Sequence, residues 1–194
     1  MSITDATRAV LDGWHPPDPE QDALRHTMLA FIDATPGPCL RECVPGHVTG
    51  SVMVFDATLR HVLLTLHPRV GKWIQLGGHC EPGDTSVAAA ALREGLEESG
   101  LDSLRLSDGP VHLHTHPITC SLGVPTRHLD VRYAAVADRT ADGSLPNIIR
   151  SDESVDLAWW PVDDLPSDID ADTIPALIEL GSAALASLPD CPPR

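Results

Sequence analysis

The spacing of apolar positions predicts two helices near the N-terminus. Within residues 20–34 the apolar side chains recur with the period of a helix, and residues 4–12 have similar spacing. The members of the longer stripe are Leu24, Met28, Leu29 and Ile32. Proline-rich turns at residues 15–19 and 36–38 interrupt the helical pattern. Residues 1–45 are therefore expected to form a helical N-terminal extension.

The pattern then changes to short apolar runs that are typical of strands. Residues 48–55 and 62–66 are two such runs, and the polar turn between them indicates a hairpin or two neighbouring strands. Further strands are expected at residues 111–115, 129–137 and 157–160. A closing helix is expected over residues 174–188, with Pro175 in its first turn. This order of elements predicts a mixed α and β fold.

The alanine-rich residues 86–99 form the clearest helical segment of the chain. Asp84, Thr85 or Ser86 is suited to cap its N-terminus, and Gly100 is suited to end it. Residues 77–84, just before this helix, contain glycines and a proline and are expected to form a loop.

The charge of the chain limits its partners. With 13 basic and 28 acidic side chains the formal net charge is −15, and no run of Lys or Arg interrupts it, so a nucleic acid is not expected as a partner. No apolar run approaches the roughly 20 residues that span a bilayer, so no membrane association is expected either. The N-terminal residues lack the basic start and apolar stretch of a signal peptide, so a cytoplasmic location is expected. The five cysteines are scattered and odd in number, which favours free thiols over a disulfide framework. A homodimer is compatible with the sequence.

Three carboxylates on the alanine-rich helix are candidates for metal binding. Glu94, Glu97 and Glu98 share one face, because their spacing is i, i+3 and i+4. Such like charges destabilise a helix unless water or a cation compensates them, so a solvated acidic face and a cation site both remain open. The preceding Gly77 and Gly78 can expose backbone carbonyls, and Mg²⁺ prefers oxygen ligands. Loop and helix together favour the cation site.

The same residues resemble the sequence signature of the Nudix (MutT-like) hydrolase family. The segments Gly78-His-Cys-Glu-Pro-Gly-Asp84 and Arg93-Glu-Gly-Leu-Glu-Glu-Ser-Gly-Leu101 are similar to the Nudix box, Gly-x5-Glu-x7-Arg-Glu-U-x-Glu-Glu-x-Gly-U, where U is bulky and apolar. The second segment is the more specific of the two.

The chain departs from this pattern in three ways. The spacing between Gly78 and Arg93 is one residue longer, and Asp84 or Thr85 therefore stands where a glutamate is usual. The third departure is Gly95, which replaces the bulky apolar residue and should cost the helix about 1 kcal/mol relative to alanine unless close packing requires it. Because of the first two departures, the residue that would support Arg93 has a shorter side chain than the usual glutamate.

The resemblance implies a fold, an activity and a set of residues. The expected fold is a mixed sheet sandwiched between α-helices over residues 46–188, with residues 189–194 as a loose tail. The expected activity is Mg²⁺-dependent hydrolysis of a phosphoanhydride bond in a nucleoside diphosphate linked to another group, with Mn²⁺ as an alternative ion. The implied metal ligands are the Gly78 carbonyl, Glu94, Glu97 and Glu98. Arg93 would orient a glutamate, Glu97 or Glu98 would act as general base, and Glu153 is the candidate for a base or ligand from outside the box.

Two other functions remain open beside this one. A non-catalytic module of the same fold would bind a nucleotide and act through a partner, although such modules usually have damaged carboxylates. A hydrolase for a non-nucleotide diphosphate would use the same metal chemistry. The sequence does not identify the nucleoside or the leaving group.

Histidines and tryptophans add less specific candidates. The alternating His112, His114 and His116 would share one face of a strand, where they would bind zinc, line the cleft together with His128 and Asp130, or face solvent. His79 would contact a phosphate or face solvent. Trp159 and Trp160 are expected to pack against the core rather than to stack on a nucleobase.

Overall fold

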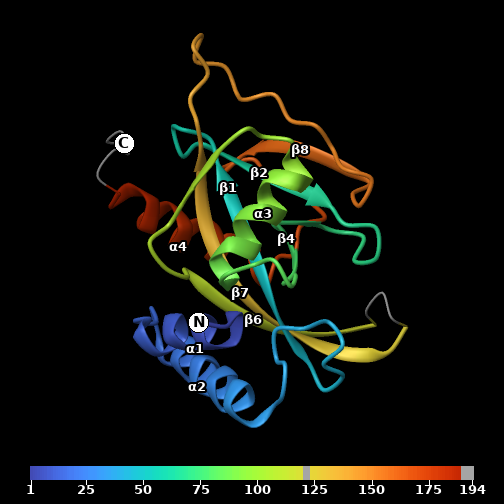
Figure 1. Ribbon diagram of the computed structural model, residues 1–194. Helices are drawn as coiled ribbons and strands as arrows, with labels where there is room; N and C mark the ends of the chain where they lie inside the picture. Colours follow the sequence, from blue (N-terminus) through green and yellow to red (C-terminus); the bar gives the residue numbers. More distant parts are fainter. Residues whose placement is uncertain (120–122, 189–194) are drawn as a thin grey trace.

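The computed structural model describes residues 1–119 and 123–188, which form four helices and one eight-stranded sheet (Figure 1). The helices are α1 (Ile3–Gly13), α2 (Pro19–Ala34), α3 (Val87–Ser99) and α4 (Ile174–Ala186). The strands are β1 (His47–Phe55), β2 (His61–Leu66), β3 (Trp73–Ile74), β4 (Leu76–His79), β5 (Leu104–Leu106), β6 (His112–Thr119), β7 (Pro125–Ala137) and β8 (Asp156–Pro161). The tail expected at residues 189–194, which includes Cys191, lies outside the described residues, as does Cys120.

Strand β1 is the centre of the sheet. It pairs in parallel with β7 and antiparallel with β2 and β4. Further out, β3 and β8 pair with β2, whereas β5 and β6 pair with β7. Every residue of β1 is buried, as expected for a strand that is covered on both faces. The pairing of β1 with β2 confirms that these two apolar runs are neighbouring strands.

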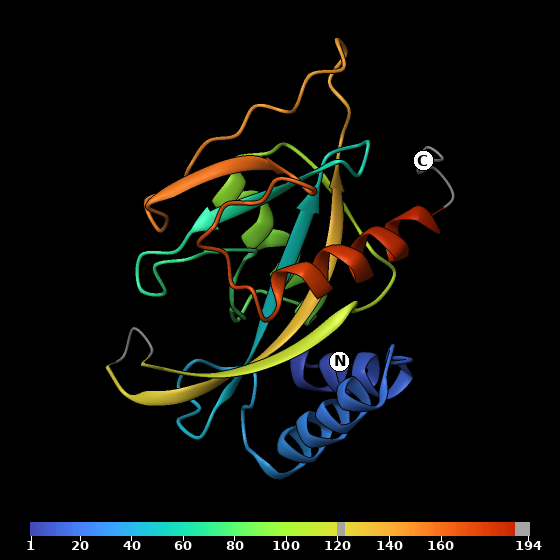
Figure 2. The same ribbon diagram turned by 180° about the vertical axis from the view of Figure 1, so that it is seen from behind.

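Helices α3 and α4 cover opposite faces of the sheet (Figures 1 and 2). Successive side chains of a strand point to opposite faces, and the two faces of β1 differ accordingly. On one face Val52 lies against Gly95 of α3, and on the other Phe55 lies against Gly181 of α4. The fold is therefore a mixed sheet between helices, which confirms the prediction from the sequence.

Glycines allow α3 to lie very close to β1. A Cβ atom at Gly50 would come within 2.8 Å of the Val87 carbonyl oxygen, and a Cβ atom at Gly95 would come within 2.8 Å of Val52 Cγ1. Real Cβ atoms do not approach other heavy atoms so closely. Gly95, the position where the Nudix box has a bulky residue, is thus explained by packing.

The prediction of a loop over residues 77–84 is wrong at its start. Residues 77–79 belong to β4, where Gly78 pairs with Gly50 and His79 pairs with Thr49. The hydrogen bonds to a buried neighbouring strand outweigh the low strand propensity of glycine. Strands β3 and β5 were not predicted, because they are too short to give a periodic signal. Helix α4 ends at Ala186 rather than at residue 188.

The N-terminal helices share a core with the sheet. Met28 of α2 is buried in the same apolar cluster as Val48 of β1 and Leu113 of β6. Gln21 ties α2 to β6, because its Nε2 donates a hydrogen bond to the Leu113 carbonyl (3.0 Å) and its Oε1 accepts one from the Leu113 N–H (2.6 Å). The extension is helical as predicted, and its separation from the rest at residue 45 stays a prediction.

Three of the five cysteines lie among the described residues. Cys39, Cys43 and Cys80 are buried free thiols. Among the described residues, no helix combines the length and the hydropathy that crossing a bilayer requires.

Replacing Gly95 with alanine should destabilise the protein, although alanine ordinarily stabilises a helix relative to glycine. The new methyl group would meet Val52 Cγ1 at 2.8 Å and Leu104 Cδ1 at 3.0 Å. Overpacking of this kind costs about 1–3 kcal/mol, which urea denaturation of the two proteins measures. Gly13→Ala is the matched control, because the described structure places no heavy atom within 4 Å of a Cβ added there. A Gly95→Ala protein as stable as wild type would show that α3 does not need this glycine.

Candidate active site

Local signals fix the position of α3 along the chain. At its start the Ser86 Oγ accepts a hydrogen bond from the Ala89 N–H (3.1 Å), which makes Ser86 the capping residue among the three candidates. At its end Gly100 adopts a left-handed conformation (φ 66°), and its N–H donates to the Leu96 carbonyl (2.9 Å). Both boundaries agree with the prediction, and they place the three glutamates on the last turns of the helix.

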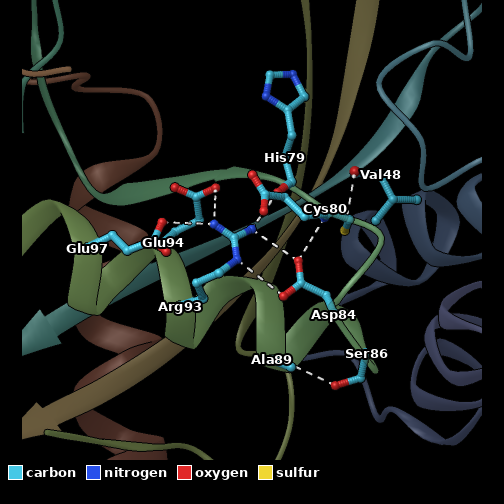
Figure 3. Close-up of polar contacts among 10 residues, drawn as sticks. Val48, His79, Cys80, Asp84, Ser86, Ala89, Arg93, Glu94 and Glu97 are labelled. Atoms are coloured by element: carbon cyan, nitrogen blue, oxygen red, sulfur yellow. Dashed lines mark hydrogen bonds and ion pairs between the residues drawn. The ribbon is translucent and has the colours of Figure 1, made fainter.

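Arg93 connects the loop before α3 to the helix itself (Figure 3). Its guanidinium donates two hydrogen bonds to the Asp84 carboxylate, at 3.2 Å from Nε to Oδ1 and at 3.0 Å from Nη2 to Oδ2. Nη2 also donates to the His79 carbonyl at 2.9 Å. Asp84, not Thr85, is therefore the partner of Arg93, and the shorter side chain reaches it in a two-pronged arrangement.

The other side of the same guanidinium faces two of the predicted metal ligands. Nη1 of Arg93 lies 3.1 Å from Glu94 Oε1 and 3.0 Å from Glu97 Oε2. The Glu94 carboxylate also lies against the backbone of β4, since a Cβ atom at Gly78 would come within 2.5 Å of Glu94 Oε1. A side chain at position 78 would thus displace this carboxylate, so glycine is required for the arrangement.

Glu98 is the most buried of the three glutamates. Its side chain accepts a hydrogen bond from the Gly77 N–H (2.9 Å), and only 7% of the residue is exposed. Burial, together with the charges of Glu94 and Glu153, raises the pKa of Glu98 to about 8, although the hydrogen bond from the Gly77 N–H opposes this rise. Burial also raises the pKa of Glu94. Carboxylates that are costly to ionise beside one another favour a bound cation, and a set of oxygen donors suits a hard divalent ion.

A cavity of about 430 Å³ opens beside this cluster. Its lining includes Gly77, Gly78 and Glu98 from the predicted metal site, and Glu153 from the segment before β8. The structure thus brings Glu153 to the same cavity as Glu98. Glu94 and Glu97 are not in the lining; they are held beside it by Arg93, and the Glu97 side chain is 61% exposed.

Comparison with known families now decides the classification. Residues 45–179, more than half of the chain, match the family model of the NUDIX domain. The chain belongs to the NUDIX family. A comparison with curated proteins gives no match.

Several solved structures share the fold. A hydrolase of the NUDIX family from Clostridium perfringens superposes with a TM-score of 0.55 and 24% identity, over 71% of this chain and 97% of that one. An Ap4A hydrolase from C. elegans gives a TM-score of 0.53 and 19% identity, over 73% of this chain and 98% of that one. The dihydroneopterin triphosphate pyrophosphohydrolase of E. coli gives a TM-score of 0.51 and 19% identity, over 71% of this chain and 96% of that one. At these identities the likeness is evidence for the fold.

Outside the Nudix box, the cavity lining contains basic side chains that the sequence did not reveal. Arg41 precedes β1 and Arg69 lies between β2 and β3, and both line the cavity. Neither belongs to a basic run or to a motif, so no local signal marks them. Both bring positive charge to the wall of the cavity that Glu98 and Glu153 also line.

A buried ion pair forms another part of the cavity wall. Asp130 accepts hydrogen bonds from Ser51 Oγ (2.6 Å) and Thr49 Oγ1 (3.0 Å), and its carboxylate lies 2.7 Å from Arg132 Nε. Burial opposes ionisation of Asp130, but the charge of Arg132 and the hydrogen bond from Ser51 hold its pKa below the ordinary value. These contacts fix a charged group inside the core of the sheet.

Two of the three alternating histidines of β6 lie side by side, because the rings of His114 and His116 stack with centroids 5.4 Å apart. His116 lines the cavity together with His128 and Asp130, which is one of the roles considered from the sequence. His114 Nδ1 is instead 3.0 Å from Arg132 Nη2, and His112 is buried. Within the described residues these three do not form a group of metal ligands. His79 also lines the cavity, and in Figure 3 its ring points away from Arg93.

The tryptophans of β8 pack as expected. Trp160 makes an edge contact with Trp73, with ring centroids 5.3 Å apart. Trp159 packs beside another apolar cluster, and its Nε1 donates to the Pro146 carbonyl (3.1 Å). Neither lines the cavity of this NUDIX domain.

The burial of Glu98 predicts a pH-dependent cost of folding in the metal-free protein. The pKa of Glu98 rises from 4.5 to about 8 on folding, so the carboxyl is protonated in both states below pH 4.5 and imposes no penalty there. Between these values only the unfolded carboxyl is ionised, and stability should fall by about 1.4 kcal/mol per pH unit. Glu98→Gln removes this penalty.

Urea denaturation with EDTA at pH 5, 6, 7 and 8 should therefore show the Glu98→Gln variant gaining stability relative to wild type as pH rises. Glu179→Gln, at an exposed position of α4, is the control and should follow wild type. A difference between Glu98→Gln and wild type that does not change with pH would contradict the assigned environment of this carboxyl.

Proposed function

We propose that this NUDIX-family protein is a Mg²⁺-dependent hydrolase that cleaves a phosphoanhydride bond in a nucleoside diphosphate linked to another group. The observation that carries the proposal is that Glu94 and Glu98 lie against the backbone of β4 beside a cavity, while Arg93 holds Glu97 next to Glu94. The volume of about 430 Å³ lies in the range of small-molecule sites. Arg41 and Arg69 supply positive charge for phosphates in that cavity.

The residues present fit a hard divalent ion. The Gly78 carbonyl with Glu94, Glu97 and Glu98 would hold Mg²⁺, and Mn²⁺ has similar ligand preferences. When bound, such an ion neutralises phosphate charge and lowers the pKa of a water ligand. The close contact of Glu94 with Gly78 and the burial of Glu98 support this fit, since both carboxylates are positioned without a full set of protein partners.

The protein's own side chains position the reacting groups. Arg93 is fixed by Asp84 and in turn holds Glu94 and Glu97, so it acts as a positioning residue. Among the candidate bases, Glu98 and Glu153 line the cavity, whereas Glu97 does not. This placement favours Glu98 or Glu153 as the group that accepts a proton from the attacking water.

The buried free thiols support a reducing location, and we therefore propose that the enzyme works in the cytoplasm on a small-molecule diphosphate. The undamaged carboxylates favour an enzyme over a non-catalytic module.

Incubation with Mg²⁺ and a panel of diphosphates tests this function. The panel contains nucleoside triphosphates, dinucleotides, ADP-ribose, nucleotide sugars and an isoprenoid diphosphate. At least one nucleoside diphosphate derivative should yield a nucleoside monophosphate and a phosphate ester, and EDTA should abolish the reaction. Turnover of the isoprenoid compound alone would favour the non-nucleotide alternative. Tight binding of one member without turnover of any would favour a non-catalytic module.

Two substitutions separate metal binding from base catalysis. Glu97→Gln should raise the Mg²⁺ concentration needed for half-maximal activity, because it removes a ligand. Glu153→Gln should leave this concentration unchanged and lower kcat by about 10²–10⁴-fold if Glu153 is the base. Glu179→Gln is the matched control on the far face of the sheet and should retain wild-type kinetics. Unchanged kcat in Glu153→Gln would transfer the role of base to Glu98.

A further inference from the structure

The sheet brings together three histidines that are far apart in the sequence. His47 begins β1, His79 ends β4 and His128 lies in β7, and both neighbouring strands pair with β1. In this register His47 is directly opposite His128, while His79 is opposite Thr49. The three ring centroids are 4.9–5.1 Å apart. One ring nitrogen from each histidine lies within 4.8 Å of the other two.

Two of the three histidines have a ring nitrogen that is buried without a hydrogen-bond partner. His47 is completely buried, and its Nδ1 is 3.3 Å from the Cys43 carbonyl, which can only accept a hydrogen bond. This contact selects the tautomer with a proton on Nδ1, which leaves Nε2 with a lone pair, and this buried Nε2 has no hydrogen-bond partner. His128 Nε2 is likewise buried and unpaired. Buried polar atoms in folded proteins nearly always have a partner, so these two require an explanation.

We propose that His47, His79 and His128 form a nitrogen-ligand site for Zn²⁺ or a similar transition-metal ion, separate from the carboxylates of the Nudix box. Imidazole suits Zn²⁺, Cu²⁺, Fe²⁺ and Ni²⁺, whereas Mg²⁺ prefers oxygen. A histidine ligand typically donates its second ring N–H to a carbonyl, as His47 does to Cys43.

The geometry is close to that of a tetrahedral site. Zn–N bonds of about 2.0–2.1 Å place ligand nitrogens roughly 3.4 Å apart, and rotation of the rings brings the three nitrogens from within 4.8 Å to that separation. Three protein ligands leave the fourth position open. Because His79 and His128 line the cavity, this position faces it and would take water or a phosphate oxygen.

Cobalt substitution tests the site without relying on catalysis. The full-length protein is freed of metal with a chelator and titrated with Co²⁺ in excess Mg²⁺, which occupies the carboxylates. Four-coordinate Co²⁺ with nitrogen ligands absorbs visible light far more strongly than six-coordinate Co²⁺ with oxygen ligands. The expected result is a strong visible band that saturates at one Co²⁺ per chain and disappears when one equivalent of Zn²⁺ is added.

Variants assign the band to the cluster. His128→Gln and the half-buried His79→Asn should each weaken Co²⁺ binding by more than the roughly 10–100-fold that loss of a second-shell contact costs. His26→Asn, at an exposed position of α2, is the matched control and should keep the band. Glu98→Gln should also keep it, because its carboxylate belongs to the other site.

Circular dichroism shows which variants are folded, and His79→Asn carries the test if His128→Gln is not. A weak six-coordinate spectrum in wild type would overturn the proposal, as would an unchanged band in a folded His79→Asn protein. Neither outcome depends on turnover, so the metal site and the proposed hydrolysis succeed or fail independently.

Discussion

The close approach of α3 to the centre of the sheet is the constraint on which the site depends. Two positions along this contact, Gly50 and Gly95, have no room for a Cβ atom, and a Cβ atom at Gly78 would displace the Glu94 carboxylate. Protein interiors are packed as densely as crystals, so the helix cannot move outward without leaving voids. The contact therefore places the carboxylates of Glu94 and Glu98 against the backbone of β4 at Gly78 and Gly77. The positions of these carboxylates beside the cavity are therefore a result of core packing.

A second constraint is the balance of charge on the last turns of α3. Three carboxylates on one face repel one another, and Arg93 is the cation that offsets two of them. The guanidinium can do so because Asp84 and the His79 carbonyl use its remaining donors and hold its plane in place. Glu98 lies beyond its reach and depends on a single backbone N–H. Arg93 thus neutralises part of the negative charge of the three glutamates, and the remainder is left for a bound cation to compensate.

The sequence predicted those features that depend on local chemistry. The apolar period, the Ser86 cap and Gly100 defined α3, and the spacing of its glutamates placed them on one face. Asp84 could not be distinguished from Thr85 as the partner of Arg93, because only the path of the loop decides which side chain reaches it. Strand β4 was missed since its pairing with β1 overrides what its own residues favour.

The histidines show the same limit. Alternation along one strand grouped His112, His114 and His116; in the structure the rings of His114 and His116 stack, but of these three only His116 lines the cavity. Contacts between His47, His79 and His128 arise from the register of three strands. Register is set by the apolar pattern and the turns of all three strands together, so the positions of these three histidines along the chain do not reveal it.

The family segment and the folding unit of this protein do not coincide. The match to the NUDIX domain covers residues 45–179, yet Leu11 and Met28 complete the apolar cluster that contains Val48. At the other end, Leu185 completes the cluster behind β1 and lies beyond the matched segment. A chain trimmed to the shared segment would present both of these apolar surfaces to water. The N-terminal helices thus cover part of the hydrophobic core of this protein. The segment that a stable fold of this chain requires is therefore longer than the segment that matches the family.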